Sequence, residues 1–99
     1  MKICYTASYL HTIFSYSEGK LYWKVRSSQR VKIGQEAGCP DEDGYIVIRL
    51  DGERYRRTQL VWAMHQHDSA RWPDYVRHVN GRHDDDRIEN LEGRLWRQK

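Results

Sequence analysis

Apolar side chains near the start of the chain recur at the three- and four-residue spacing of a helix: Tyr9, Leu10, Ile13 and Phe14. This spacing predicts a helix over residues 6–16, with Thr6 as its N-cap. After a polar break the period changes to two, and apolar side chains alternate with basic ones. That alternation predicts a strand over residues 21–26 with a wet, basic outer face.

The middle of the chain combines an irregular connection with a hairpin. Residues 27–44 are polar and contain several glycines, so we expect a long loop with a short strand over residues 31–33. Residues 45–57 are rich in β-formers on both sides of Asp51-Gly52, a dipeptide typical of two-residue hairpin turns. The pattern therefore predicts an antiparallel hairpin there.

A second helix is predicted over residues 59–67, with Thr58 as its cap. Its expected buried stripe has helical spacing and consists of Leu60, Val61 and Met64. A Trp-Pro dipeptide at residues 72–73 ends this unit, because the residue before a proline disfavours helix.

The last quarter of the chain predicts three short elements. Residues 75–79 form a strand, a helix capped by Asp85 or Asp86 runs to Leu91, and residues 94–96 form a closing strand. Together the patterns indicate an α+β fold with a small antiparallel sheet and helices.

Length and composition indicate one compact domain. The chain has 99 residues, of which 38% are hydrophobic and 31% charged, the profile of a globular protein rather than a disordered one. We expect residues 1–57 to form a helix and basic β leader, residues 58–74 a helix and connector, and residues 75–99 a C-terminal core. Cys4 and Cys39 show no CxxC pattern, so free thiols are expected. The absence of a long apolar run or signal-peptide pattern predicts an intracellular, cytoplasmic protein without a membrane partner.

Basic side chains gather in two places, and the net charge of the chain is +3. These two clusters consist of Lys20, Lys24, Arg26, Arg30 and Lys32, and of Arg54, Arg56 and Arg57. They are interpreted either as solvated strand faces or as a surface for nucleic acid, with DNA as the expected partner.

Two motifs near the end carry a family resemblance: His78-Val79-Asn80-Gly81 and Arg87-Ile88-Glu89-Asn90-Leu91. They follow a leader that contains Gly19-Lys20-Leu21-Tyr22-Trp23-Lys24-Val25 and Val31-Lys32-Ile33-Gly34-Gln35-Glu36-Ala37-Gly38. In this order the chain resembles the small HNH homing-type endonucleases common in phages. The resemblance implies a ββα-metal unit over residues 75–99 and an origin in a phage or mobile element.

The resemblance also assigns roles to individual residues. His78 matches the general base and Asn90 the structural asparagine of the motif. Arg77 and Lys99 stand where the family keeps its metal ligands, so no metal site is expected, and Mg²⁺ or Mn²⁺ would be needed only by an active enzyme. Both cations would instead contact nucleic acid.

Two further positions depart from the family pattern. Asp86 stands where many members have asparagine, and Thr58 replaces a histidine that commonly opens the preceding helix. We therefore expect a contact near the start of that helix to be altered.

Three functions remain open. The first is a DNA-binding protein with impaired phosphodiester cleavage. The second is a phage-encoded inhibitor or regulator that binds a host protein. The third is an active nicking endonuclease whose metal has moved to the run His83-Asp84-Asp85-Asp86, although such a run is also typical of a solvated loop that caps a helix.

Overall fold

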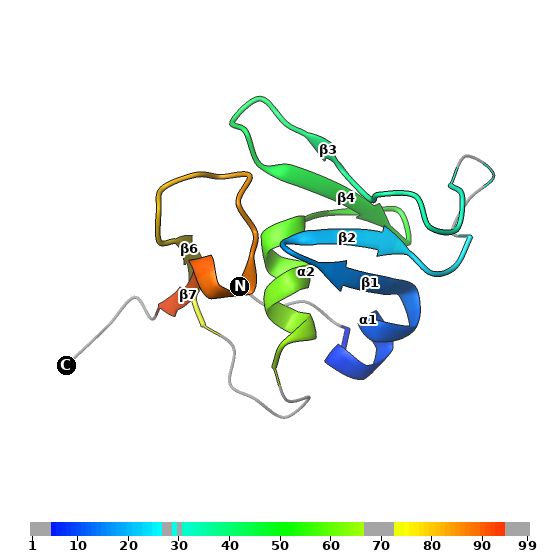
Figure 1. Ribbon diagram of the computed structural model, residues 1–99, viewed down its shortest axis with the longest axis horizontal. Helices are drawn as coiled ribbons and strands as arrows, with labels where there is room; N and C mark the ends of the chain where they lie inside the picture. Colours follow the sequence, from blue (N-terminus) through cyan, green and yellow to red (C-terminus); the bar gives the residue numbers. More distant parts are fainter. Residues whose placement is uncertain (1–4, 27–28, 30, 67–72, 95–99) are drawn as a thin grey trace.

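The computed structural model describes residues 5–26, 29, 31–66 and 73–94 (Figure 1). The elements in these ranges are α1 (Ala7–Ile13), β1 (Phe14–Ser17), β2 (Lys20–Trp23), β3 (Cys39–Pro40), β4 (Ile46–Leu50), β5 (Glu53–Arg56), α2 (Arg57–Met64), β6 (Tyr75–His78), the 3₁₀ helix η1 (Ile88–Asn90) and β7 (Leu91–Arg94). The strands form three small antiparallel sheets, β1-β2, β3-β4-β5 and β6-β7. The expected α+β class is confirmed.

Helix α1 is shorter than predicted. Thr6 is its N-cap, as expected, because the Thr6 hydroxyl accepts from the Tyr9 amide at 3.1 Å. However, the helix ends at Ile13, and Phe14 begins β1 opposite Trp23 of β2. The prediction of helix to residue 16 is wrong, because antiparallel pairing of residues 14–17 with β2 overrides the helical spacing.

The free edge of β2 is covered by a later segment of chain. The amide of Ala37 donates to the Leu21 carbonyl at 2.8 Å, and the amide of Trp23 donates to the Gln35 carbonyl at 3.0 Å. No strand forms over residues 31–33 in the described chain, so that prediction is wrong and the pairing lies a few residues later.

The predicted β4–β5 hairpin is confirmed. Asp51 and Gly52 both have positive φ values, 54° and 82°, as a two-residue turn of type I′ requires. Ile48 and Leu50 face the core and are buried. Arg49 and Arg54 are paired across the hairpin on its outer face, and both are exposed.

Helix α2 begins before the predicted cap. Arg56 is the N-cap residue, and its amide donates to the side chain of Gln59 at 3.1 Å. Thr58 is therefore inside the first turn, where its buried hydroxyl faces the β6–β7 unit rather than the helix amides. The stripe predicted for this helix is confirmed and includes Leu60, Val61 and Met64.

The strand predicted over residues 75–79 is β6, which ends one residue earlier, at His78, and pairs with β7. Strand β7 lies earlier than predicted, at Leu91–Arg94, while residues 95–99 fall outside the described ranges. The short helix is the 3₁₀ turn η1, whose N-cap is Arg87 without a side-chain hydrogen bond. The prediction that Asp85 or Asp86 caps it is wrong, because both carboxylates bind arginine side chains.

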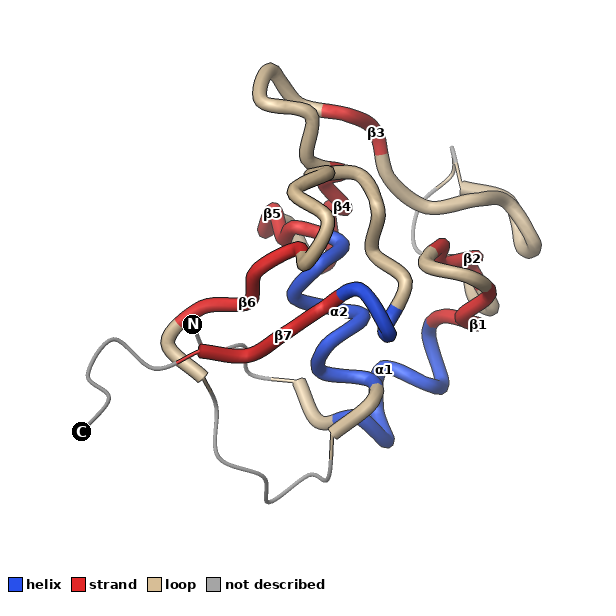
Figure 2. Tube along the Cα trace, turned by 60° about the vertical axis from the view of Figure 1, so that its left-hand side comes forward, coloured by secondary structure: helices blue, strands red, loops and turns tan. Residues whose placement is uncertain are grey.

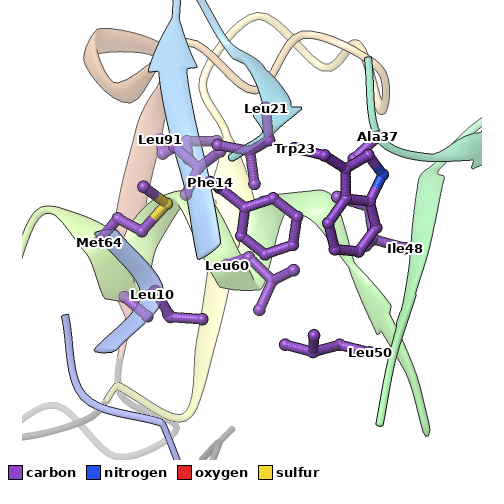
Figure 3. Close-up of a cluster of buried hydrophobic side chains, with 12 residues drawn as sticks. Leu10, Phe14, Leu21, Trp23, Ala37, Ile48, Leu50, Leu60, Met64 and Leu91 are labelled. Carbon is purple, nitrogen blue, oxygen red and sulfur yellow. The ribbon is translucent and has the colours of Figure 1, made fainter. Parts of the chain in front are cut away.

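One apolar cluster lies between α2 and the sheets (Figure 3). Phe14 is at its centre, with its ring 4.7 Å from that of Trp23. The cluster consists of Leu10, Phe14, Leu21, Trp23, Ala37, Ile48, Leu50, Leu60, Val61, Ala63, Met64 and Leu91. Figures 1 and 2 show β1-β2 on one side of α2 and β6-β7 on the other, so this helix connects the core to the C-terminal hairpin.

Two expectations from composition bear on the surface. Cys39 is exposed and has a free thiol, while Cys4 lies outside the described ranges. Neither α-helix of the described chain has the length and apolar character of a membrane span.

Candidate functional site

His78 ends β6, and its side chain is held against the start of α2. Its Nε2 lies 2.8 Å from Asp86 Oδ1 and 3.1 Å from the Thr58 hydroxyl oxygen. The Thr58 hydroxyl donates to the same carboxylate oxygen. An ionised carboxylate only accepts hydrogen bonds, so His78 carries a proton on Nε2 and donates it to Asp86.

Arg57 completes this buried group. Its Nε donates to Asp86 Oδ2 at 2.8 Å and its Nη2 to the Asp84 carbonyl at 2.9 Å, while Nη1 lies 3.6 Å from Glu36. Only 4% of its side chain is exposed. The guanidinium thus balances the buried carboxylate, and Arg57 serves the interior of the site rather than the surface cluster to which the sequence assigned it.

Asn90 joins the two ends of the loop between β6 and β7. Its side-chain oxygen accepts from the Asn80 amide at 3.1 Å. Its Nδ2 donates to Asn80 Oδ1 at 3.0 Å and to the Asp85 carbonyl at 2.9 Å. These three bonds fix the loop that carries Asp86, so Asn90 acts on His78 indirectly.

The consecutive carboxylates of the loop have separate partners. Asp84 pairs with Arg82, and Asp86 with Arg57. Asp85 receives two hydrogen bonds from Arg87, which hold the pKa of its carboxyl well below the usual range. Within the described ranges, no group of three or more His, Cys, Asp or Glu side chains is arranged to hold a metal ion.

The approach of this loop to the β1–β2 turn depends on Gly19. Its φ is +86°, and a Cβ there would lie 2.6 Å from the Arg87 amide nitrogen. Only glycine combines this backbone conformation with so close an approach.

His78 is one of the residues that line a cavity of about 220 Å³. The lining residues are Tyr45, Arg56, Thr58, Gln59, Asp74, Tyr75, Val76 and His78. Because Nε2 carries the proton, Nδ1 of the neutral ring is an acceptor. It makes no hydrogen bond with any residue that the structure describes.

Beside the cavity, three side chains from different segments stack on one another. The rings of Tyr45 and His83 are 4.1 Å apart with an interplanar angle of 6°. The guanidinium carbon of Arg56 lies 3.7 Å from the centroid of the Tyr45 ring. Two groups at these distances cannot share one face of the ring, so Arg56 and His83 lie on opposite faces of Tyr45.

Arg77 is not brought to the same side of β6 as His78. Neighbouring residues of a strand point to opposite faces, and Arg77 Nη1 lies 3.0 Å from Glu92 on β7. Glu92 also pairs with Arg94 at 2.9 Å. A guanidinium does not suit a divalent cation, so the side chain at this position does not fit a metal ligand. Lys99 lies outside the described ranges.

The predicted basic residues are spread over two regions. Lys20 opens β2 beside the loop at Arg87, whereas Lys24 and Arg26 follow the strand and donate to backbone carbonyls. Lys32 is exposed and Arg30 lies outside the described ranges. These cations therefore do not form one patch within the described chain.

The second region gathers on one face of β4–β5. Arg54 and Arg56 are joined there by Arg49, which is not in either of the two predicted basic clusters. The signal was present: a two-residue turn at Asp51-Gly52 places residue 49 opposite residue 54.

Comparison of this chain with protein-family models, curated proteins and solved structures gives no match.

Proposed function

We propose that this chain binds DNA through the outer face of the β4–β5 hairpin and is impaired in metal-dependent cleavage. The observation that carries the proposal is the pair Arg49 and Arg54, which lie directly opposite each other and are both exposed. Like charges at directly opposite positions destabilise a hairpin. A phosphate backbone would turn this repulsion into attraction.

The charge of this face is not balanced by any carboxylate in the part of the chain that the structure describes. Arg49, Arg54 and Arg56 form no ion pair with any described residue. By contrast, each exposed arginine of the β6–β7 hairpin and its loop has a carboxylate partner. These residues are Arg77, Arg82, Arg87 and Arg94. The surface that we call the arginine face, made of Arg49, Arg54 and Arg56, is therefore the strongest candidate for a polyanion.

The resemblance to HNH endonucleases supports a nuclease-like frame. The antiparallel β6–β7 hairpin corresponds to the ββ part of a ββα-metal unit, with His78 at its first strand and Asn90 before its second. A closing helix would fall on residues beyond 94, outside the described ranges. Arg77 at an expected ligand position argues against metal binding, which favours DNA binding without efficient cleavage.

The test is the salt dependence of duplex DNA binding, measured by fluorescence anisotropy. Each phosphate contact contributes about 0.9 to the slope of log K against log salt. Arg49→Gln/Arg54→Gln should therefore flatten the slope by about 2. The matched control, Arg82→Gln/Arg94→Gln, removes the same charge from residues that already have acidic partners and should change the slope little.

Equal effects in both double variants would show a general charge effect and reject the arginine face. Failure of the native chain to bind either duplex or single-stranded DNA at low salt would reject DNA binding altogether. Plasmid nicking that requires Mg²⁺ or Mn²⁺ and disappears in His78→Ala would reject impaired cleavage.

A further inference from the structure

The stack of Arg56, Tyr45 and His83, which we call the stacking ladder, is built before any ligand arrives. Nδ1 of His83 donates to the Asp43 carbonyl at 2.9 Å. The amide of Tyr45 donates to Asp41 Oδ1 at 3.0 Å. Because the His83 bond and the contacts on both faces of the Tyr45 ring already order these side chains, a ligand that stacks on them would cause little loss of side-chain entropy.

Both ends of the stacking ladder are open. Arg56 and His83 are exposed, whereas Tyr45 between them is half-buried. A planar group can therefore stack on the outer side of the guanidinium or of the imidazole. Any nucleobase can stack on a guanidinium or aromatic face, because every base has a planar π surface.

The cavity beside Arg56 offers a bound ring both space and polar neighbours. Its volume of about 220 Å³ corresponds to about seven water molecules. That volume is large enough for one planar ring system. Its lining includes the polar residues Thr58, Gln59 and His78.

We propose that the stacking ladder and this cavity bind one unpaired base of single-stranded DNA. The inference rests on the DNA-binding role proposed above and specifies the form of DNA. Arg56 belongs to both the arginine face and the stacking ladder, so a strand whose phosphates follow Arg49 and Arg54 can place a base at the cavity. In duplex DNA every base is paired and stacked, and extruding one requires energy.

The experiment compares three labelled ligands: an oligothymidylate about 8 nucleotides long, an abasic oligomer of the same number of phosphates, and a duplex. The oligothymidylate should bind about 10-fold more tightly than the abasic oligomer, because stacking adds to phosphate contact. Tyr45→Leu should remove this advantage and leave abasic binding unchanged. Tyr45→Phe, which keeps the ring, should restore most of it.

A second variant provides an independent result if Tyr45→Leu misfolds. His83→Ala changes an exposed residue and should reduce the preference for bases over abasic sites in the same direction. Equal binding of the oligothymidylate and the abasic oligomer by the native chain would overturn the inference, as would a His83→Ala variant that keeps the full preference for bases.

The two proposals fail in different ways. If the abasic oligomer and the duplex bind with a salt dependence that Arg49→Gln/Arg54→Gln reduces, but bases add nothing, only the stacking ladder is rejected. If none of the three ligands binds at low salt, both proposals are rejected, since the inference depends on DNA binding.

Discussion

Arg57 and Asp86 form a buried ion pair, with Nε of the arginine 2.8 Å from Oδ2 of the carboxylate. The pair connects the first turn of α2 to the loop between β6 and β7. The other carboxylate oxygen of Asp86, Oδ1, accepts hydrogen bonds from the Thr58 hydroxyl and from His78 Nε2. A single carboxylate therefore neutralises the buried guanidinium and also determines the orientation of the His78 ring.

Replacing Asp86 with asparagine should be strongly destabilising. The Asp86→Asn side chain presents an amide to three donors, and it leaves Arg57 as a buried charge whose one remaining carboxylate partner among the described residues is Glu36, 3.6 Å away. Removing one partner of a buried ion pair costs about 3–5 kcal/mol. We expect the free energy of unfolding to fall by about 3 kcal/mol in urea denaturation.

The neighbouring exposed carboxylate provides the control. Asp84→Asn breaks a surface pair with Arg82 and should change the free energy of unfolding by less than about 0.5 kcal/mol. The double variant Arg57→Gln/Asp86→Asn should lose less than the sum of the two single variants, because both belong to one interaction. Strict additivity would contradict the pairing.

The tautomer of His78 can be observed directly. Because Asp86 only accepts hydrogen bonds, the neutral ring should hold its proton on Nε2 and leave Nδ1 unprotonated. Long-range ¹H–¹⁵N correlation spectra at a pH where the ring is neutral should show these two nitrogen types. A neutral ring with its proton on Nδ1 would contradict the geometry.

Gly19 and Gly52 have similar φ angles, so alanine substitutions at these two positions distinguish backbone strain from a steric clash. Gly52 has φ +82° and no atom within 4 Å of an added Cβ, whereas the Cβ of Gly19→Ala would meet backbone at 2.6 Å. Gly52→Ala should therefore cost about 1 kcal/mol, the left-handed penalty alone. Gly19→Ala should cost about 1–3 kcal/mol more, because the loop backbone must move.

Thermal or urea unfolding of both variants provides the measurement. The amide resonances of Asp86 and Arg87 should shift in Gly19→Ala and stay in place in Gly52→Ala. Equal destabilisation by the two substitutions would show that the β1–β2 turn does not closely approach the loop.

Local patterns were sufficient to predict the elements that depend on local chemistry. The β4–β5 hairpin follows from its turn dipeptide, and the buried stripe of α2 follows from its spacing. Strand β1 was missed because Phe14 continues the spacing of α1. The residues after Phe14 become a strand only through pairing with β2, which is not visible in a helical pattern.

The candidate site was predicted only in part. The family motif drew attention to His78 and Asn90. It did not show that Asp86 is buried, because an acidic loop residue is ordinarily exposed. The partner of Asp86 is 29 residues away at Arg57, and such a distant pairing depends on how α2 packs against the β6–β7 hairpin. The stacking ladder likewise joins three segments that are separated in sequence.

Asp85 makes the stability of the loop depend on pH. Arg87 donates to its two carboxylate oxygens at 2.8 and 2.9 Å, and Asn80 adds a third hydrogen bond at 2.7 Å. These donors, Arg87 foremost, lower the pKa of the carboxyl in the folded protein. In the unfolded chain the pKa of the same carboxyl is about 3.9.

Because the folded pKa is the lower one, the contribution of Asp85 to the free energy of unfolding is complete above about pH 4 and is lost as the pH falls toward the folded pKa. Asp85→Asn should therefore reduce stability near neutral pH, and its difference from the native chain should shrink in acid. Arg87→Gln removes the main cause and keeps the carboxyl, so it should weaken the same pH dependence. Urea unfolding midpoints measured from neutral pH to about pH 2.5 cover this interval. A difference between Asp85→Asn and the native chain that stays constant with pH would show that Arg87 does not hold this carboxylate.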